Sequence, residues 1–242
     1  MNPLRIFAFL ALCLLSLTAA ADSLRPGKYI LLEGWGSLTL GADKGKGQPV
    51  AIETTGANAH VCELKGNLRK GVVVPTNPPS RPCTISIKAK GDDIELQPSN
   101  FDPEACNYYC GARATYDGTY RLPPPSCERK QLRQRQDLFL KQYRTKTYDQ
   151  AHATLSSLIA ECGVFYNWID QDKLRNDLAI TEYHLGRYQD CLKTLEPNTG
   201  TAHPDMESLQ ELPPADFDMF STIAPATWKN RALCEKGLKA KK

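Results

Sequence analysis

Two different hydrophobic periods divide the chain. From about residue 23 to residue 122, short apolar runs alternate with polar residues and are interrupted by Gly, Asn or Pro. This period of two predicts strands at 29–32, 37–40, 49–53, 59–64, 84–88 and 94–96. Short alternating strands separated by turn residues indicate an antiparallel β sandwich or a small barrel.

A run of prolines marks a domain boundary. Residues 122–126 read Leu-Pro-Pro-Pro-Ser, and proline supports neither a helix interior nor a strand ladder. We therefore expect an α+β protein with a β domain at 22–122, a stiff linker at 123–127 and a helical domain at 128–242.

An internal repeat appears beyond the linker, where the apolar residues recur at helical spacing. An offset of 40 residues superimposes four pairs: Leu138 on Leu178, Tyr143 on Tyr183, Tyr148 on Tyr188 and Leu155 on Leu195. In the second copy Ala179 and Cys191 are small where two helices would cross, and Gly186 permits a sharp turn.

This second copy resembles the tetratricopeptide repeat, which implies paired antiparallel helices and says little about function. The first copy departs from the pattern, because Phe139 and Lys146 stand where Ala and Gly are expected. A partial third unit from Trp228 to Cys234 is expected to form a capping helix.

Residues 1–21 have the features of a secretory signal peptide. Arg5 precedes an apolar run from Ile6 to Leu17, and small residues follow at 18–21. The apolar run is shorter than the roughly 20 residues that span a bilayer, and no later segment is apolar enough to do so. We expect an exported protein of the periplasm without a membrane span.

The cysteines indicate disulfides. Nine are present, and Cys13 leaves with the leader. The remaining eight are Cys62, Cys83, Cys106, Cys110, Cys127, Cys162, Cys191 and Cys234. An even number in an exported chain is typical of a disulfide framework. Since five precede the helical domain and three lie within it, full oxidation requires a bridge between the halves or at their junction. Zinc is disfavoured, because Cys106 and Cys110 are the only close cysteine pair and no two histidines have the spacing of metal ligands.

Charge and motifs exclude several functions. The net charge of +3, or +2 without Arg5, gives no basis for binding nucleic acid or anionic membranes. The chain has no nucleophile elbow, no zinc-protease motif and no phosphate-binding glycine loop. Its four histidines lie in four separate segments. We therefore expect neither catalytic residues nor a metal or cofactor.

The strongest candidate for binding is an insertion at 198–224, between the second repeat and the cap. It contains acidic and large apolar residues without any Lys or Arg, and Cys191 and Cys234 flank it as though a bridge held its base. Such long insertions are often functional. Together with Trp35 at a glycine-flanked turn, the predicted partner-binding residues are Asp205, Glu207, Glu211, Asp216, Phe217, Asp218 and Phe220.

A tyrosine-rich stretch has two open interpretations. Residues 106–120 hold Tyr108, Tyr109, Tyr116 and Tyr120 between Cys and Gly residues. They form either a binding face or a disulfide-linked segment covering one end of the β domain.

The spacing of Cys62, Cys83, Cys106 and Cys110, with Gly118-x-Tyr120, resembles small cysteine-rich β modules of exported Gram-negative proteins, some similar to periplasmic lysozyme inhibitors. With the leader and the repeats, the layout resembles periplasmic immunity proteins that neutralise type VI-secreted toxins such as phospholipase D-like lipases.

This resemblance implies a protein partner, a toxin or lipase, but it carries over no residue roles. The charge and apolar side chains of the acidic insertion lead us to expect that this segment blocks the partner's active site. Deleting residues 205–220 should then weaken inhibition without unfolding the rest. A periplasmic scaffold that holds a peptide in its helical groove and a lysozyme inhibitor remain alternatives. Neither the partner nor the oligomeric state follows from the sequence.

Overall fold

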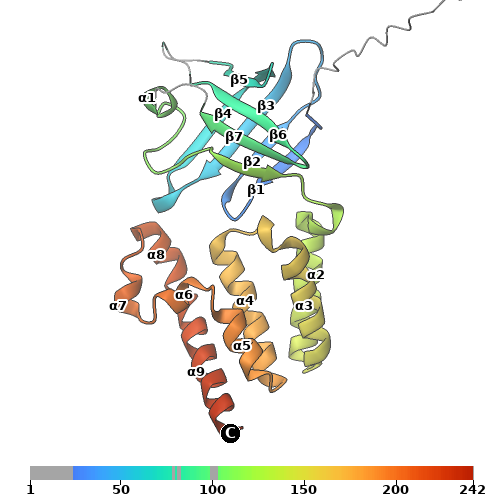
Figure 1. Cartoon of the computed structure of the whole chain (residues 1–242), viewed down its shortest axis with the longest axis vertical. Coiled ribbons are helices and arrows are strands. Elements are labelled where there is room, and N and C mark those ends of the chain that lie inside the picture. Colours follow the sequence, from blue (N-terminus) through green and yellow to red (C-terminus); the bar gives the residue numbers. More distant parts are fainter. Residues whose placement is uncertain (1–23, 78–79, 81–82, 99–102, 242) are drawn as a thin grey trace, which may run out of the picture.

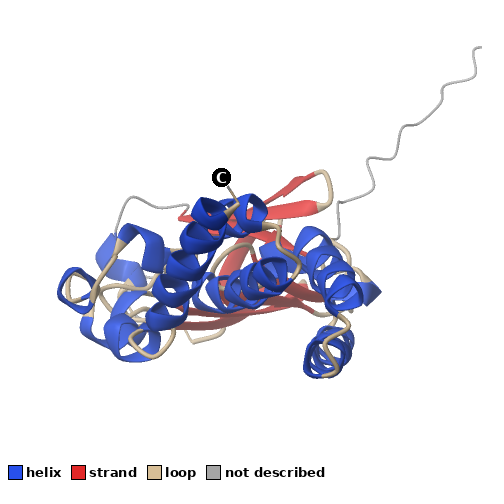
Figure 2. Cartoon of the chain, turned by 90° about the horizontal axis from the view of Figure 1, so that it is seen from below, coloured by secondary structure: helices blue, strands red, loops and turns tan. Residues whose placement is uncertain are grey.

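The barrel and the helices occupy separate halves of the molecule. The computed structural model describes residues 24–77, 80, 83–98 and 103–241. An N-terminal β-barrel sits above a C-terminal helical layer (Figure 1), and a view from below shows the helices lying across one end of the barrel (Figure 2). The α+β class is thus confirmed, whereas the predicted signal peptide lies outside the described residues.

The β domain is a closed barrel, and not a sandwich. Eight antiparallel strands follow one another in sequence order, and β8 pairs with β1 to close the sheet. The strands are β1 (Gly27–Leu31), β2 (Trp35–Leu40), β3 (Gln48–Thr55), β4 (Val61–Arg69), β5 (Val72–Pro75), β6 (Ile85–Lys90), β7 (Asp93–Pro98) and β8 (Gly118–Arg121). All six predicted strands are present, and β5 and β8 are additional.

Alternation along each strand fills the barrel interior. In β4 every second residue from Cys62 to Leu68 is buried, as expected for side chains that point alternately inward and outward. Tyr120 is fully buried and donates its hydroxyl proton to the carbonyl of Tyr116, so its polar end is satisfied inside the core. The short helix α1 (Pro103–Cys106) and the segment after it are tied to the barrel by two disulfides, Cys62–Cys110 and Cys83–Cys106.

Eight helices form the C-terminal layer. They are α2 (Arg129–Arg144), α3 (Tyr148–Cys162), α4 (Trp168–His184), α5 (Tyr188–Leu195), α6 (Thr199–Ala202), α7 (Met206–Leu209), α8 (Pro214–Phe220) and α9 (Ala224–Ala240). Three short 3₁₀ helices join elements: η1 (Ala57–Ala59), η2 (Pro125–Cys127) and η3 (Gly163–Phe165). The predicted capping unit at 228–234 is the central part of α9.

The internal repeat is a pair of equivalent helical hairpins, α2–α3 and α4–α5. At the first turn the N–H of Lys146 donates to the carbonyl of Tyr143, and at the second turn Gly186 donates to Tyr183. The small residues Ala151 and Cys191 are completely buried at equivalent places in α3 and α5. The 40-residue offset thus describes real structural equivalence, although Leu138 is exposed where its counterpart Leu178 is buried.

The acidic insertion is folded and is not an open loop. It forms α6, α7 and α8, which lead into α9. The disulfide Cys191–Cys234 joins α5 to α9 and so holds the base of the insertion, as its flanking position predicted. Leu209 and Phe220 are completely buried. Deleting residues 205–220 would therefore remove core side chains, contrary to the expectation that this segment is dispensable for folding.

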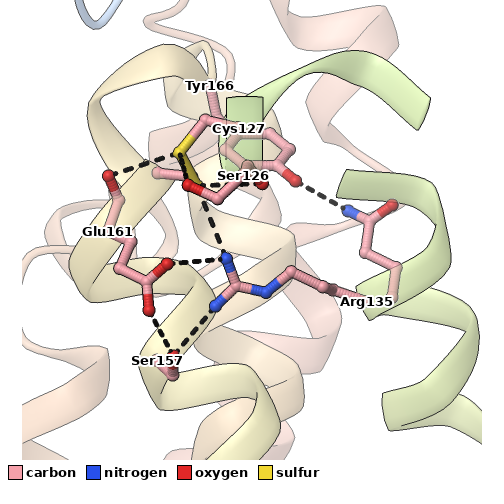
Figure 3. Close-up of a disulfide and its surroundings, with 8 residues drawn as sticks. Ser126, Cys127, Arg135, Ser157, Glu161 and Tyr166 are labelled. Atoms are coloured by element: carbon pink, nitrogen blue, oxygen red, sulfur yellow. Dashed lines mark hydrogen bonds and ion pairs between the residues drawn. A yellow bond between two sulfur atoms is a disulfide. The ribbon is translucent and has the colours of Figure 1, made fainter. Parts of the chain in front are cut away.

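A fourth disulfide fastens the linker to the helices. Cys127, at the end of the proline-rich stretch, bonds to Cys162 at the end of α3. Figure 3 shows Arg135 of α2 beside this bridge, where its guanidinium contacts Glu161 at 3.0 Å and Ser157 at 2.9 Å. The number of cysteines in each half required a disulfide between the halves or at their junction. The Cys127–Cys162 bridge is that disulfide.

The barrel and the helical layer meet through specific contacts. The N–H of Glu33, in the β1–β2 turn, donates to the carbonyl of Val164 at 3.0 Å. Asn58, in the β3–β4 turn, accepts a hydrogen bond from the backbone N–H of Ala215 in α8, also at 3.0 Å. Trp35 packs against Trp168, with 6.3 Å between ring centroids. The two halves thus share a hydrophobic cluster.

Candidate protein-binding surfaces

The acidic insertion presents a negatively charged surface with exposed methionines. The side chains of Met206 and Met219 are 43% and 41% exposed. The four acidic residues Asp205, Glu207, Glu211 and Asp218 are exposed as well. Since residues 198–224 contain no Lys or Arg, no cation within the segment offsets these charges. A flexible apolar side chain among carboxylates is a surface suited to a partner that is both basic and apolar.

Four of the predicted binding residues support this surface and do not form it. Phe220 is completely buried, Asp216 is 6% exposed, and Phe217 and Trp35 are partly buried in the same cluster. This cluster lies between the barrel and the helices, so its large side chains already have a packing partner within the chain. The expectation that Trp35 is an exposed anchor is therefore not met.

Local hydrogen bonds make the acidic segment rigid. Asp205 caps α7, because its carboxylate accepts the N–H of Ser208 at 2.8 Å. The indole N–H of Trp228 donates to the carbonyls of Gly200 and His203, at 2.9 and 2.8 Å. The exposed carboxylates therefore project from a scaffold fixed by α9, which reduces the conformational entropy lost on binding.

A second candidate surface is a cleft of about 480 Å³ between α2 and α4. Phe139, Leu155 and Leu174 line it with apolar side chains, all of them buried. Leu140 also lines it and is 38% exposed, so apolar surface reaches the rim. The charged lining residues are Arg129, Arg133, Asp137, Asp170, Lys173 and Asp177. An apolar floor with charges of both signs around it suits a peptide segment.

The third candidate surface is the outer face of the barrel over β1 to β4. Two adjoining depressions, of about 590 and 290 Å³, lie on it and share Glu53 and Glu63. Val61 is 57% exposed on one side, and Tyr108 is 69% exposed on the other. Tyr108 and Tyr109 pack edge to face, with ring centroids 5.0 Å apart. Sequence reasoning singled out these tyrosines but missed the glutamates.

No family model matches this chain, and no curated protein or solved structure is significantly similar to it. The surfaces therefore have to be judged on their own chemistry.

Several reactive side-chain types are already bonded within the described residues. The eight described cysteines are all in disulfides, so none of these thiols is free. No group of three or more His, Cys, Asp or Glu side chains gathers as a metal site would. His152 contacts Glu182 at 3.4 Å, and His184 packs among Tyr143, Tyr148 and Tyr183. Among the helices described, none is long and apolar enough to cross a membrane.

The register of β3 against β4 would have revealed the pair of glutamates that sequence reasoning missed. Glu53 and Glu63 are direct partners in the β3–β4 hairpin, but their pairing depends on the length of the turn between the strands. That turn contains η1, whose Asn58 and Ala59 both have positive φ. A turn of this kind has no simple sequence signature, so the strands were predicted without their alignment. Leu140 at the rim of the α2–α4 cleft was missed because α2 has many charged residues.

Proposed function

We propose that this chain is an exported protein that binds a second protein and inhibits it, in the manner of an immunity protein. The observation that carries the proposal is the rigid, exposed acidic surface of α7 and α8, which also exposes Met206 and Met219. Four disulfides in the described chain are typical of proteins outside the cytosol. We place its action in the periplasm.

The chemistry of the surface defines the partner. Exposed carboxylates without neighbouring cations attract a basic protein and accelerate its association. A toxin whose active site binds anionic substrates, such as a phospholipase, would present cations there. Those cations would pair with the four exposed carboxylates, which are Asp205, Glu207, Glu211 and Asp218. The methionines would cover the adjoining apolar surface of the toxin.

The decisive experiment begins by asking whether the adjacent gene encodes a secreted toxin or lipase, and it pairs this protein with that product. The toxin is expressed in the periplasm with and without the mature chain, and survival is scored. We expect protection by the wild type. Purified protein is then added to the toxin and, separately, to lysozyme, and the inhibition constant is measured. Inhibition of lysozyme alone would assign the protein to that class instead.

An isosteric variant tests the surface without disturbing the core. Asp205→Asn, Glu207→Gln, Glu211→Gln and Asp218→Asn are combined, because asparagine still caps α7. We expect inhibition at least about tenfold weaker, since rim charges mainly govern association.

The matched control combines Asp149→Asn, Asp190→Asn, Glu196→Gln and Glu235→Gln, which remove four exposed helical carboxylates elsewhere. Equal losses in both variants would show that net charge, and not this surface, drives binding. Unchanged inhibition in the first variant would remove the acidic segment from the mechanism.

A second candidate function is a scaffold that holds a peptide between α2 and α4, as the likeness to tetratricopeptide repeats suggests. The apolar floor of the cleft and the exposed Leu140 favour it. Leu140→Glu should abolish peptide capture and leave toxin inhibition intact, whereas Leu138→Glu, on the same helix but outside the cleft lining, is the control. Loss of toxin inhibition in Leu140→Glu would instead show that both activities use one surface.

A further inference from the structure

Two carboxylates face each other on the outer surface of the barrel. Glu53 of β3 and Glu63 of β4 are direct cross-strand partners, and both are exposed. Like charges directly opposite each other destabilise a sheet. Neither glutamate forms an ion pair with any residue that the structure describes. Lys28 and Lys65 line the two depressions without pairing with either glutamate, so no ion pair among the described residues offsets the repulsion.

A polar side chain beside the pair also lacks a partner. Ser37 lies opposite Glu53 on β2, and its neighbour Leu38 points into the core, so the serine side chain faces outward. Ser37 is only 7% exposed and lines the larger depression. Its hydroxyl makes no hydrogen bond within the described part of the chain. The hydroxyl oxygen is not among the described buried atoms that lack a partner, so it reaches solvent in the depression, where a ligand can bond to it.

Aromatic and aliphatic side chains surround these polar groups. On one side Ile30, Trp35 and Val61 line the larger depression. On the other side the N–H of Glu63 donates to the carbonyl of Tyr109, which brings this tyrosine and its neighbour Tyr108 alongside the pair. Carboxylates framed by aromatic rings suit a guanidinium group, which bonds to carboxylates with its edge and stacks on rings with its face.

We propose that this face is a docking site for an arginine side chain presented by a protein partner. The guanidinium lies between Glu53 and Glu63 and relieves their repulsion. An aliphatic neighbour of that arginine fills the depression beside Val61 and Trp35, and a polar group of the partner's backbone satisfies the Ser37 hydroxyl. The site lies outside the acidic α7–α8 surface and does not depend on it.

The test uses the mature chain and two short peptides as probes. Acetyl-Leu-Arg-Leu-amide and acetyl-Leu-Gln-Leu-amide are titrated in turn, and backbone amide shifts are followed by NMR. We expect the arginine peptide to shift the amides of Ser37, Glu53 and Glu63, with millimolar affinity that weakens as salt is added. Equal binding of the glutamine peptide, or shifts confined to residues 205–219, would overturn the proposal.

A double variant, Glu53→Gln with Glu63→Gln, separates binding from folding. It removes the repulsion, so we expect an unchanged or raised Tm and at least tenfold weaker binding of the arginine peptide. The control, Asp43→Asn with Asp92→Asn, removes two charges from barrel turns and should leave binding within twofold. A lowered Tm in the glutamate variant would show that the pair stabilises the fold, and equal losses in both variants would show attraction by net charge alone. Either result refutes the site.

Discussion

Lys146 and Gly186 adopt the same left-handed backbone conformation at equivalent turns of the two helical hairpins, with φ of 58° and 68°. Glycine enters this region without strain, whereas a residue with a Cβ is destabilised there. The first hairpin therefore keeps the shape of the second although its sequence lacks the glycine. The hydrogen bonds that end α2 and α4 enforce the turn in both.

The strain at Lys146 predicts a stabilising substitution. Lys146→Gly should raise the free energy of unfolding by about 0.5–1 kcal/mol, because the relief of strain exceeds the added freedom of the unfolded chain. Gly186→Ala should lower it by a similar amount. Urea denaturation followed by circular dichroism measures both. A destabilised Lys146→Gly variant would show that the lysine side chain has a stabilising contact that outweighs the strain.

Asn58 of the barrel caps a helix of the other half. Its side-chain oxygen accepts the N–H of Ala215 at the start of α8, where Pro213 occupies the N-cap position and its ring carries no acceptor. Asn58→Gly keeps the positive φ and removes only the cap, so we expect a loss of about 1 kcal/mol in urea denaturation. Asn58→Ala adds backbone strain and should lose more. An Asn58→Gly variant as stable as the wild type would mean that water replaces the cap.

The Cys127–Cys162 bridge closes a loop of 35 residues in sequence separation. Replacing both cysteines by alanine should lower the free energy of unfolding by about 3–4 kcal/mol, as expected when a loop of this length gains freedom in the unfolded state. Urea denaturation without reductant compares this variant with the wild type. Coincident unfolding curves would contradict the expectation.

Asp172 gives the stability a dependence on pH. Burial raises the pKa of this carboxyl to about 6, opposed by the N–H of Thr199 and by Arg175. The folded protein therefore holds the proton more tightly than the unfolded chain, and this group lowers stability as the pH rises from about 4 to about 6.

Asp172→Asn removes that titration and retains an oxygen that can accept the N–H of Thr199. The free energy of unfolding of the variant minus that of the wild type should increase by about 2 kcal/mol as the pH rises from 4 to 7. Denaturation at several pH values provides the measurement. A difference that stays constant with pH would assign the dependence to another group.

Local patterns determined how much of the fold could be predicted. Alternation revealed six strands, but β5 and β8 are only four residues long and offer too few positions to show a period. Lys70 and Gly71 form the turn between β4 and β5, and both have positive φ. The glycine is the sequence signal that would have indicated a hairpin with β5 as its second strand. Closure of the sheet depends on the pairing of β1 with β8, a long-range contact that no local pattern encodes.

The binding surface was predicted in part for the same reason. Acidic composition identified the segment around α7 and α8, but composition does not distinguish exposed from buried members. Asp216 is buried, and Phe220 belongs to a cluster built with Trp35 of the barrel, which is more than 180 residues away in sequence. Only the assembled fold shows which carboxylates face outward.

The two halves are attached at two places, by the hydrogen bond of Glu33 to Val164 and by the contacts of Asn58 and Trp35. If the halves touched at one place only, the barrel could rotate about the proline-rich linker. Because they touch at two places, the linker is a spacer between the halves and not a hinge. A partner that spans both halves thus meets a single fixed pose, and no rotational freedom between them has to be lost on binding.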